Sequence, residues 1–171
     1  MPENDVAPAA LSGATVFIKP KRARPFFGRH PWALDSAILR VDGNPDSGDV
    51  VDVVTHEGNF IARGLWNASS RIRVRLYSFM QDQALDHIFW NTRIENAVAL
   101  RQQLGLFSKK TGCRLINSEG DNLSGVIVDQ YGPYLAVQVT ALAMAERLDM
   151  ICDSLDDDAE VHVEARKIIV S

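Results

Sequence analysis

Residues 71–77 are Arg-Ile-Arg-Val-Arg-Leu-Tyr, so charged or polar side chains alternate with apolar ones at every step. Successive side chains of a β-strand point to opposite faces, and this period of two therefore predicts a strand with one buried and one outer face. The predicted buried face carries Ile72, Val74 and Leu76. The predicted outer face carries Arg71, Arg73, Arg75 and Tyr77.

The segments before this strand predict further strands separated by turns. Val-rich or alternating stretches are expected to form strands at Thr15–Ile18, Ile38–Val41, Asp49–Thr55 and Phe60–Trp66. Turn residues follow Val41, Asp46 and Glu57, where Gly and Asn tolerate a positive φ and Pro fixes φ. Lys21–Phe27 is expected to form a short helix or a helical turn. Short strands spaced by turns over about 65 residues predict a compact mixed β-barrel.

The pattern changes to a helical period after the barrel. Asp82 is the expected N-cap of a helix that runs to about Leu104 and ends at Gly105. A second helix is expected after these residues, at Ala143–Leu155. Between the two helices, strands are expected at Arg114–Asn117, Val126–Gln130 and Leu135–Thr140. A small α+β unit is therefore predicted to follow the barrel.

These elements predict an α+β protein with two folded units. Residues 15–80 are expected to form the barrel, and residues 81–155 the second, α+β domain. Residues 1–14 are expected to be a disordered leader, because they are acidic and rich in Pro and Ala. Residues 156–171 are expected to be an acidic tail, or a continuation that has been truncated.

Composition excludes several classes of protein. The 171 residues are 46% hydrophobic and 23% charged, as in ordinary globular proteins. The N-terminus lacks the basic and apolar regions of a secretory signal, and no stretch approaches about 18 apolar residues, so we expect a cytoplasmic protein without a membrane partner. Cys113 and Cys152 have no metal-like or CxxC spacing and are expected to be buried free thiols.

The net charge of −4 conceals a strong asymmetry along the chain. Residues 146–171 are strongly acidic, whereas residues 16–40 carry a single acid, Asp35. The basic residues of that N-terminal segment are Lys19, Lys21, Arg22, Arg24, Arg29 and Arg40. Clustered cations neutralise phosphates and release counterions, so the N-terminal half is the part suited to a polyanion. The alternative is a solvated surface that is merely basic.

Arginine and aromatic side chains extend the candidate surface. Arg71, Arg73 and Arg75 would repel one another unless anions or carboxylates lie between them, and Arg63 on the adjacent strand could join either arrangement. One possibility is that RNA phosphates lie between these arginines. The alternative is that acids on a neighbouring strand lie there. His30 and Trp32 could stack on unpaired bases, although core packing is the more common use of tryptophan.

Residues 118–125 form either a ligand loop or a turn-rich connector, because two carboxylates flank a glycine there. The sequence contains no G-x-G fingerprint, GxSxG elbow, Walker loop or HExxH pair. No catalytic, cofactor-binding or metal-binding residue is therefore predicted in this chain.

Four segments, taken in order, resemble one known family. They are Gly-Arg-His-Pro-Trp-Ala-Leu at 28–34, Phe-Ile-Ala-Arg-Gly at 60–64 with Arg-Ile-Arg-Val-Arg at 71–75, and the stretch from Glu119 to Gly132. Together they resemble the ribosomal RNA large-subunit methyltransferase I-like proteins. Asn122 and Ser124 stand where the family pattern usually has Gly and Pro. Because Asn tolerates a positive φ, the turn is expected to survive.

The resemblance implies a PUA domain up to about Phe79 and a central α+β domain after it. It also implies that full-length members continue into a Rossmann-like domain, which binds S-adenosylmethionine and methylates C5 of a cytosine in 23S ribosomal RNA. That domain carries the cofactor glycines and the nucleophilic cysteine, and no position of this chain matches them. We therefore expect no cofactor here and no activity from this chain alone.

The leading hypothesis is that the chain binds ribosomal RNA. A catalytic methyltransferase domain would act with it, either in the same polypeptide or as a separate partner. The alternative is a protein-interaction module, for example one that forms a homodimer through the second unit. The predicted RNA-binding residues are Lys19, Lys21, Arg22, Arg24, Arg29, His30, Trp32, Arg63, Arg71, Arg73 and Arg75.

Overall fold

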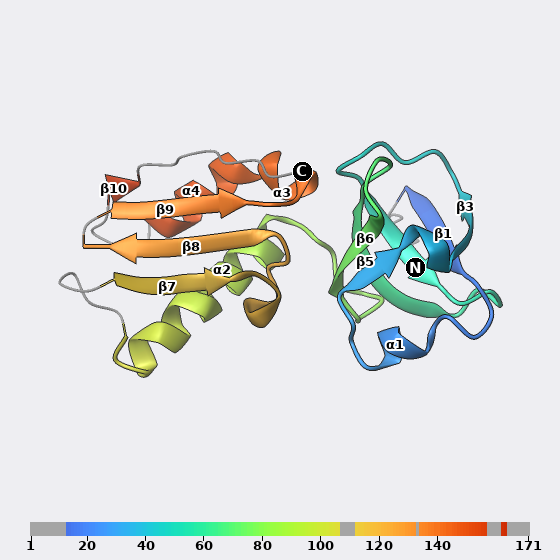
Figure 1. Ribbon diagram of the computed structural model, residues 1–171, viewed down its shortest axis with the longest axis horizontal. Helices are drawn as coiled ribbons and strands as arrows, with labels where there is room; N and C mark the ends of the chain where they lie inside the picture. Colours follow the sequence, from blue (N-terminus) through green and yellow to red (C-terminus); the bar gives the residue numbers. More distant parts are fainter. Residues whose placement is uncertain (1–12, 107–111, 133, 157–161, 164–171) are drawn as a thin grey trace, which may run out of the picture.

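The computed structural model describes residues 13–106, 112–132, 134–156 and 162–163. These residues form two bodies side by side, a curled sheet and a unit of helices on a flatter sheet (Figure 1). The predicted α+β class, with a barrel followed by a small α+β unit, is confirmed. No helix within the described ranges is both long and apolar enough to cross a membrane.

The N-terminal unit is a mixed sheet of six strands in the order β2-β6-β5-β4-β1-β3. Strands β1 and β4 pair in parallel, and the other neighbours are antiparallel. Between the strands lie the short helix α1 (Arg24–Phe27) and a 3-10 turn at Asp35–Ala37. The strands are β1 (Ala14–Ile18), β2 (Trp32–Leu34), β3 (Ile38–Asp42), β4 (Val50–Val54), β5 (Phe60–Trp66) and β6 (Ile72–Ser78).

The alternation of residues 71–77 places one face of β6 in the barrel core, as predicted. Val74 is fully buried and Leu76 is 3% exposed, and both pack with Val16, Ile18 and Val53. Strand β5 passes very close to β6 at Gly64, where a Cβ atom would overlap the carbonyl oxygen of Arg75. Any other residue would force these two strands apart.

Strand β2 was not predicted from the sequence. Its three residues follow His30-Pro31, and its burial does not alternate over enough positions to show a period. It forms because Ala33 is fully buried and the segment pairs with β6, where Trp32 lies opposite Arg75. This pairing covers the edge of β6 and brings the chain after α1 back onto the barrel.

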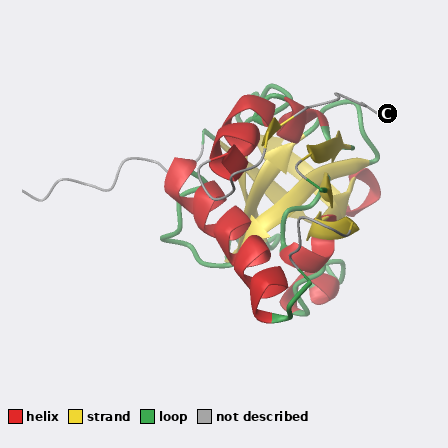
Figure 2. Cartoon of the chain, turned by 90° about the vertical axis from the view of Figure 1, so that its left-hand side faces the viewer, coloured by secondary structure: helices red, strands yellow, loops and turns green. Residues whose placement is uncertain are grey.

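The second unit is a sheet in the order β10-β9-β8-β7 with helices against its buried face. Figure 2, which views the molecule from the side of this unit, shows helices flanking the sheet. Helices α2 and α4 contact each other and share one core with the strands. The helices are α2 (His87–Gln103), α3 (Leu142–Ala145) and α4 (Leu148–Asp156). The strands are β7 (Gly112–Asn117), β8 (Val126–Tyr131), β9 (Tyr134–Val139) and β10 (His162–Val163).

Two helix predictions were wrong in detail. The first helix begins at His87, not after Asp82, because the Asp86 side chain accepts a hydrogen bond from the Phe89 N–H at 2.9 Å. The predicted second helix is divided into α3 and α4. At this break the Arg147 guanidinium donates to the carbonyl oxygen of Gly48 in the barrel, 3.3 Å away. A contact between the two units thus accompanies the interruption.

Candidate nucleic-acid interface

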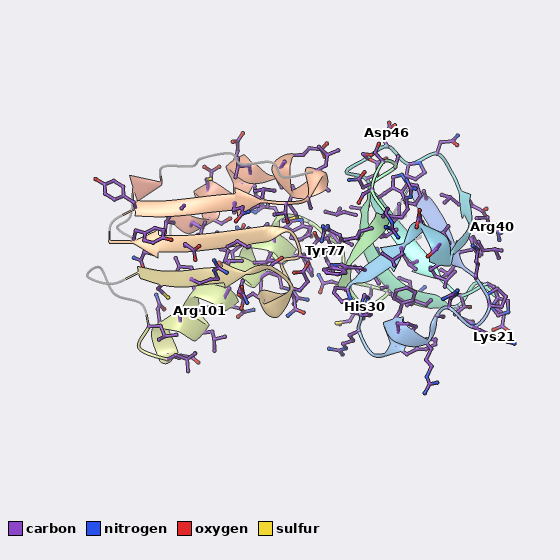
Figure 3. The ribbon with its side chains drawn as sticks, in the orientation of Figure 1. Lys21, His30, Arg40, Asp46, Tyr77 and Arg101 are labelled. Atoms are coloured by element: carbon purple, nitrogen blue, oxygen red, sulfur yellow. The ribbon has the colours of Figure 1, made fainter. Side chains whose placement is uncertain are left out.

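Four exposed cations surround α1, and we call them the basic rim: Lys21, Arg22, Arg24 and Arg29. Within the described part of the chain, no ion pair or hydrogen bond engages their side chains. Figure 3 places Lys21 at the outer side of the barrel and His30 at the side that faces the second unit. The segment that carries the rim therefore crosses the barrel from its outer side toward the junction of the two units.

The barrel holds the rim segment in a defined conformation. Phe26 of α1 is 3% exposed and packs in the barrel core. The backbone N–H groups of Arg22 and Arg29 donate to the carbonyl oxygens of Lys19 and Phe26 at 3.0 and 2.9 Å. Lys21 and Arg29 have φ values of 65° and 59°, a region that bulky residues seldom adopt and that often marks functional sites.

Lys19, at the start of the segment, is exposed but not unpartnered. Its ammonium group donates to the carbonyl oxygen of Ser36 at 2.9 Å. The adjoining Arg40 pairs with Asp42 and lies over the ring of Phe17. Among the cations of residues 16–40, the free positive charge is thus concentrated on the rim.

The side chain of Arg63 is buried and bound to other groups of the protein. Its side chain is 2% exposed, and its Nε and Nη2 atoms donate to the two carboxylate oxygens of Asp52 at 2.7 and 3.2 Å. Its Nη1 atom donates to the carbonyl oxygen of Gln83 at 2.5 Å. No RNA phosphate could reach this guanidinium without opening the fold, so the expectation that Arg63 contacts RNA is corrected.

The three arginines of the alternating segment have different surroundings. Arg71 is exposed, whereas the guanidinium of Arg73 lies 5.5 Å from the Trp66 ring and donates to the carbonyl oxygen of Asn67 at 3.3 Å. Arg75 is 17% exposed, and its Nη1 atom lies 3.3 Å from Glu119 Oε1. Of the three, only Arg71 presents its charge openly to solvent.

The two aromatic candidates, His30 and Trp32, also differ in how far they are exposed. His30 is exposed, and its ring lies edge-on to Trp32 with centroids 5.9 Å apart. Trp32 is half-buried, and its indole N–H donates to Glu119 Oε1 at 3.0 Å. The tip of Trp32 therefore anchors the barrel to the second unit, and His30 remains the accessible ring.

Residues 118–125, which include a 3-10 turn at Ser118–Asp121, join β7 to β8 and contact the barrel. The Ser124 hydroxyl donates to Glu119 Oε1 at 2.6 Å and accepts from Arg75 Nη1 at 2.8 Å. The buried Tyr77 hydroxyl donates to the Ser124 carbonyl oxygen at 2.7 Å. Asn122 has a φ of 56°, so the predicted left-handed turn is present. The segment is thus the connector between β7 and β8, and these contacts tie it to the barrel.

The Glu119 carboxylate is the centre of this junction. Burial by itself raises its pKa, whereas hydrogen bonds from Ser124, Ser118 and Trp32 lower it, and the balance holds the pKa of Glu119 below its ordinary value. On the other side of the connector, Arg101 of α2 forms two hydrogen bonds with Asp121, at 2.6 and 2.8 Å. The connector is thus fixed from both units.

A cavity of about 310 Å³ lies beside this junction. Arg29 of the rim lines it from the barrel, and Arg93 lines it from α2. Burial and then the positive charge of Arg29 lower the pKa of Arg93. Sequence reasoning missed Arg93, because a single arginine on a helix carries no signal until the fold brings it opposite another cation.

No group of three or more His, Cys, Asp or Glu residues is placed to hold a metal ion within the described ranges. Cys113 and Cys152 are half-buried, which is more exposed than predicted.

Comparison with known proteins agrees with this architecture. A family model described as a PUA-like domain matches residues 16–79. Ribosomal RNA large subunit methyltransferase I of Shewanella denitrificans is 37% identical over 139 residues, which are 81% of this chain and 35% of the relative. The same protein from Aeromonas hydrophila is 34% identical over 142 residues, 83% of this chain and 36% of the relative. The chain thus spans about a third of the length of these relatives.

Solved structures share the fold at low sequence identity. A SAM-dependent methyltransferase from Streptococcus mutans matches 90% of this chain and 40% of its own, with a TM-score of 0.75 and 13% identity. A methyltransferase in complex with SAH matches 90% and 39%, with a TM-score of 0.70 and 16% identity. Residues 16–79 thus match a PUA-like domain, and most of the chain is similar to about a third of ribosomal RNA large subunit methyltransferase I.

Proposed function

We propose that the chain binds ribosomal RNA through the basic rim of its PUA-like domain. The observation that carries the proposal is the concentration of four exposed cations without described partners on a chain whose net charge is −4. Such an imbalance attracts a polyanion to one surface and keeps it from the acidic remainder. The relatives are named as ribosomal RNA methyltransferases, and these names support ribosomal RNA as the proposed polyanion.

Phosphate contacts of this kind supply affinity and depend on salt. Each cation that neutralises a phosphate releases a counterion, so binding weakens steeply as the salt concentration rises. The proposed contacts read the shape of the RNA and not its sequence, as is usual for structured RNA. Lys19, Arg71 and Arg73 contribute at the margin, and the exposed His30 ring offers a stacking surface for an unpaired base.

The chemical step is assigned to a separate catalytic domain, in the same polypeptide or in a partner. The proposed reaction is methylation of C5 of a cytosine in 23S ribosomal RNA, with S-adenosylmethionine as the methyl donor. The role of the described residues is to hold the RNA, and the proposal places this work in the cytoplasm, where ribosomal RNA is the substrate.

The test compares two double variants of equal charge change. Arg22→Gln/Arg24→Gln removes two rim cations, and Arg40→Gln/Arg114→Gln removes two exposed cations that already have acidic partners. Binding of ribosomal RNA fragments is measured by fluorescence anisotropy at several KCl concentrations. We expect the rim variant to lose roughly tenfold or more in affinity and to reduce the salt slope by about two, with little change in the control. Equal losses in both variants would contradict the proposal.

A dimerisation module is the second candidate. Leu100, Leu104 and Leu106 are 45%, 62% and 51% exposed at the C-terminal end of α2 and just beyond it. Exposed apolar side chains in one region are typical of protein contacts. Sedimentation with and without ribosomal RNA separates the two functions: a dimer without RNA binding would favour this one.

A further inference from the structure

We propose that the cavity between the barrel and α2 binds one unpaired nucleotide of the RNA, with its phosphate between Arg29 and Arg93. This inference rests on the proposed function and adds a second, more selective contact to it. The rim holds the strand by charge, and Arg29 belongs to both the rim and the cavity. A strand that follows the rim from Lys21 toward His30, which faces the second unit (Figure 3), would therefore approach the cavity that Arg29 lines.

The charges around the cavity favour an anion. Arg29 and Arg93 come from different units and line the same space. The acid in the lining is Glu119, and Arg75, at 3.3 Å, already neutralises it. Within the described residues, the two lining arginines therefore have no acidic partner of their own.

Arg93 is held in place but keeps donors to spare. Its Nη2 atom donates to the Tyr77 carbonyl oxygen at 3.3 Å, and its guanidinium lies 5.1 Å from the Phe89 ring. An arginine has five N–H donors, and one is used here among the described contacts. The planar fork of a fixed guanidinium fits the oxygens of a phosphate better than any other side chain.

The repulsion between Arg29 and Arg93 also favours a phosphate as the ligand. Two like charges that line one partly buried cavity repel each other, and this repulsion adds to burial in lowering the pKa of Arg93. A phosphate between them would replace the repulsion by two attractions. Arg29 also has a left-handed backbone, with a φ of 59°, a costly conformation that is often found at functional sites.

The remainder of the lining suits a base. The apolar part of the lining consists of Leu76, Phe79, Met80 and Phe89. Amide groups come from Gln83 and Asn122. Tyr77 cannot contribute its hydroxyl, which is bound to Ser124. A mixed wall beside a cationic pair matches a nucleotide better than a free inorganic ion. A cavity of about 310 Å³ admits one extruded nucleotide and excludes a duplex.

The experiment uses the full 171-residue chain and two RNA probes. One is a ribosomal RNA hairpin with an unpaired loop, and the other is a blunt duplex of the same length. Arg93→Gln is compared with Arg114→Gln, which removes the same charge from an exposed site on the same unit. We expect Arg93→Gln to weaken loop binding about tenfold, the loss of one charged hydrogen-bonding contact, and to leave duplex binding nearly unchanged.

Three further arms make the outcome decisive. Arg29→Gln/Arg93→Gln should cost less than the sum of the two single changes, because both arginines hold the same phosphate. Arg93→Lys, which keeps the charge and loses the fork, should fall between the parent chain and Arg93→Gln, and it serves as the test if Arg93→Gln does not fold. Calorimetry with uridine monophosphate and with inorganic phosphate identifies the source of the anion: Arg93-dependent binding of either without any effect on loop RNA would overturn the proposal.

Failure of the inference is distinguishable from failure of the proposed function. If the rim variant loses RNA and Arg93→Gln binds the loop as Arg114→Gln does, the rim is an RNA surface and the cavity is not a nucleotide site. If neither variant changes binding, both proposals fall together.

Discussion

The basic rim and the arginines of residues 71–75 are two cationic regions of the same barrel with different surroundings. The rim lies on a segment between strands, and its side chains project from α1 and its flanks without described partners. Two of these arginines lie on β6, where Arg73 packs over Trp66 of the neighbouring barrel strand and Arg75 pairs with Glu119 of the second unit. The rim cations thus stay available to a ligand, whereas Arg73 and Arg75 are used by the fold.

The largest contrast is expected for Arg63, the most deeply buried arginine. Replacing Arg63 by Met removes two hydrogen bonds to Asp52 and leaves that carboxylate without a partner. We expect the free energy of unfolding to fall by about 3 kcal/mol. Arg24→Gln, on the rim, should change it by less than about 0.5 kcal/mol. Urea unfolding measures both.

The double variant Asp52→Asn/Arg63→Met serves as the control for Arg63. Removal of both charges should recover part of the lost stability, because no buried charge is then left alone. A double variant that is less stable than Arg63→Met would show that the ion pair is not the cause of the loss.

A smaller effect is expected at the junction of the two units. Ser124→Ala removes the hydroxyl that joins Arg75 and Glu119, and Ser124 is only 2% exposed. The expected loss of unfolding free energy is about 1–2 kcal/mol, because partly buried partners lose a hydrogen bond. The exposed Ser69→Ala is the matched control and should be neutral within about 0.5 kcal/mol. Equal stability of the two variants would exclude a stabilising role for the hydroxyl.

The fold was largely predictable because its strands and helices have their own periods. The alternation of residues 71–77 and the turn residues between strands led to the barrel, and the apolar spacing of Phe89, Ile94 and Val98 led to α2. The start of α2 was misplaced because Asp82 and Asp86 are equally good caps in sequence. The choice between them depends on the packing of Leu85, which is a tertiary contact.

The candidate site was less predictable, because it depends on which charges the fold pairs. Arg63 and Arg71 look alike in the sequence, and the difference is that Asp52 lies opposite Arg63 on the neighbouring strand. Tyr77 was assigned to the outer face by period alone, but that face meets Trp90 of the second unit with ring centroids 4.9 Å apart. The contacts of Glu119 with Trp32 and Arg75 span distant parts of the chain and leave no local signal.

The pH dependence of stability tests Glu119 at the junction. Its pKa is lower in the folded chain than in the unfolded chain, so the ionised carboxylate stabilises the fold at neutral pH. This contribution is present above the ordinary carboxyl pKa and is lost as the pH falls through the lower folded value. The difference in unfolding free energy between the parent chain and Glu119→Gln should therefore shrink between pH 6 and the acid range, roughly below pH 4.

The control for this pH series is Glu95→Gln, at an exposed position of α2. Its unfolding free energy should follow that of the parent chain at every pH. If the Glu119→Gln difference stayed constant with pH, ionisation of Glu119 would have no part in holding the two units together.

The smallest effect is expected at Arg71, which shares features with both the rim and the alternating segment. Arg71 belongs to the alternating segment but is exposed like the rim. Arg71→Gln should leave stability within about 0.5 kcal/mol of the parent chain and reduce the salt slope of RNA binding by at most about one. Arg75→Gln should do the reverse, since its guanidinium is bound to Glu119 and Ser124: stability falls and the salt slope stays. The exposure of an arginine, and not its position in the alternating segment, would then decide whether it contacts RNA. A loss of RNA affinity in Arg75→Gln without a loss of stability would reverse that rule.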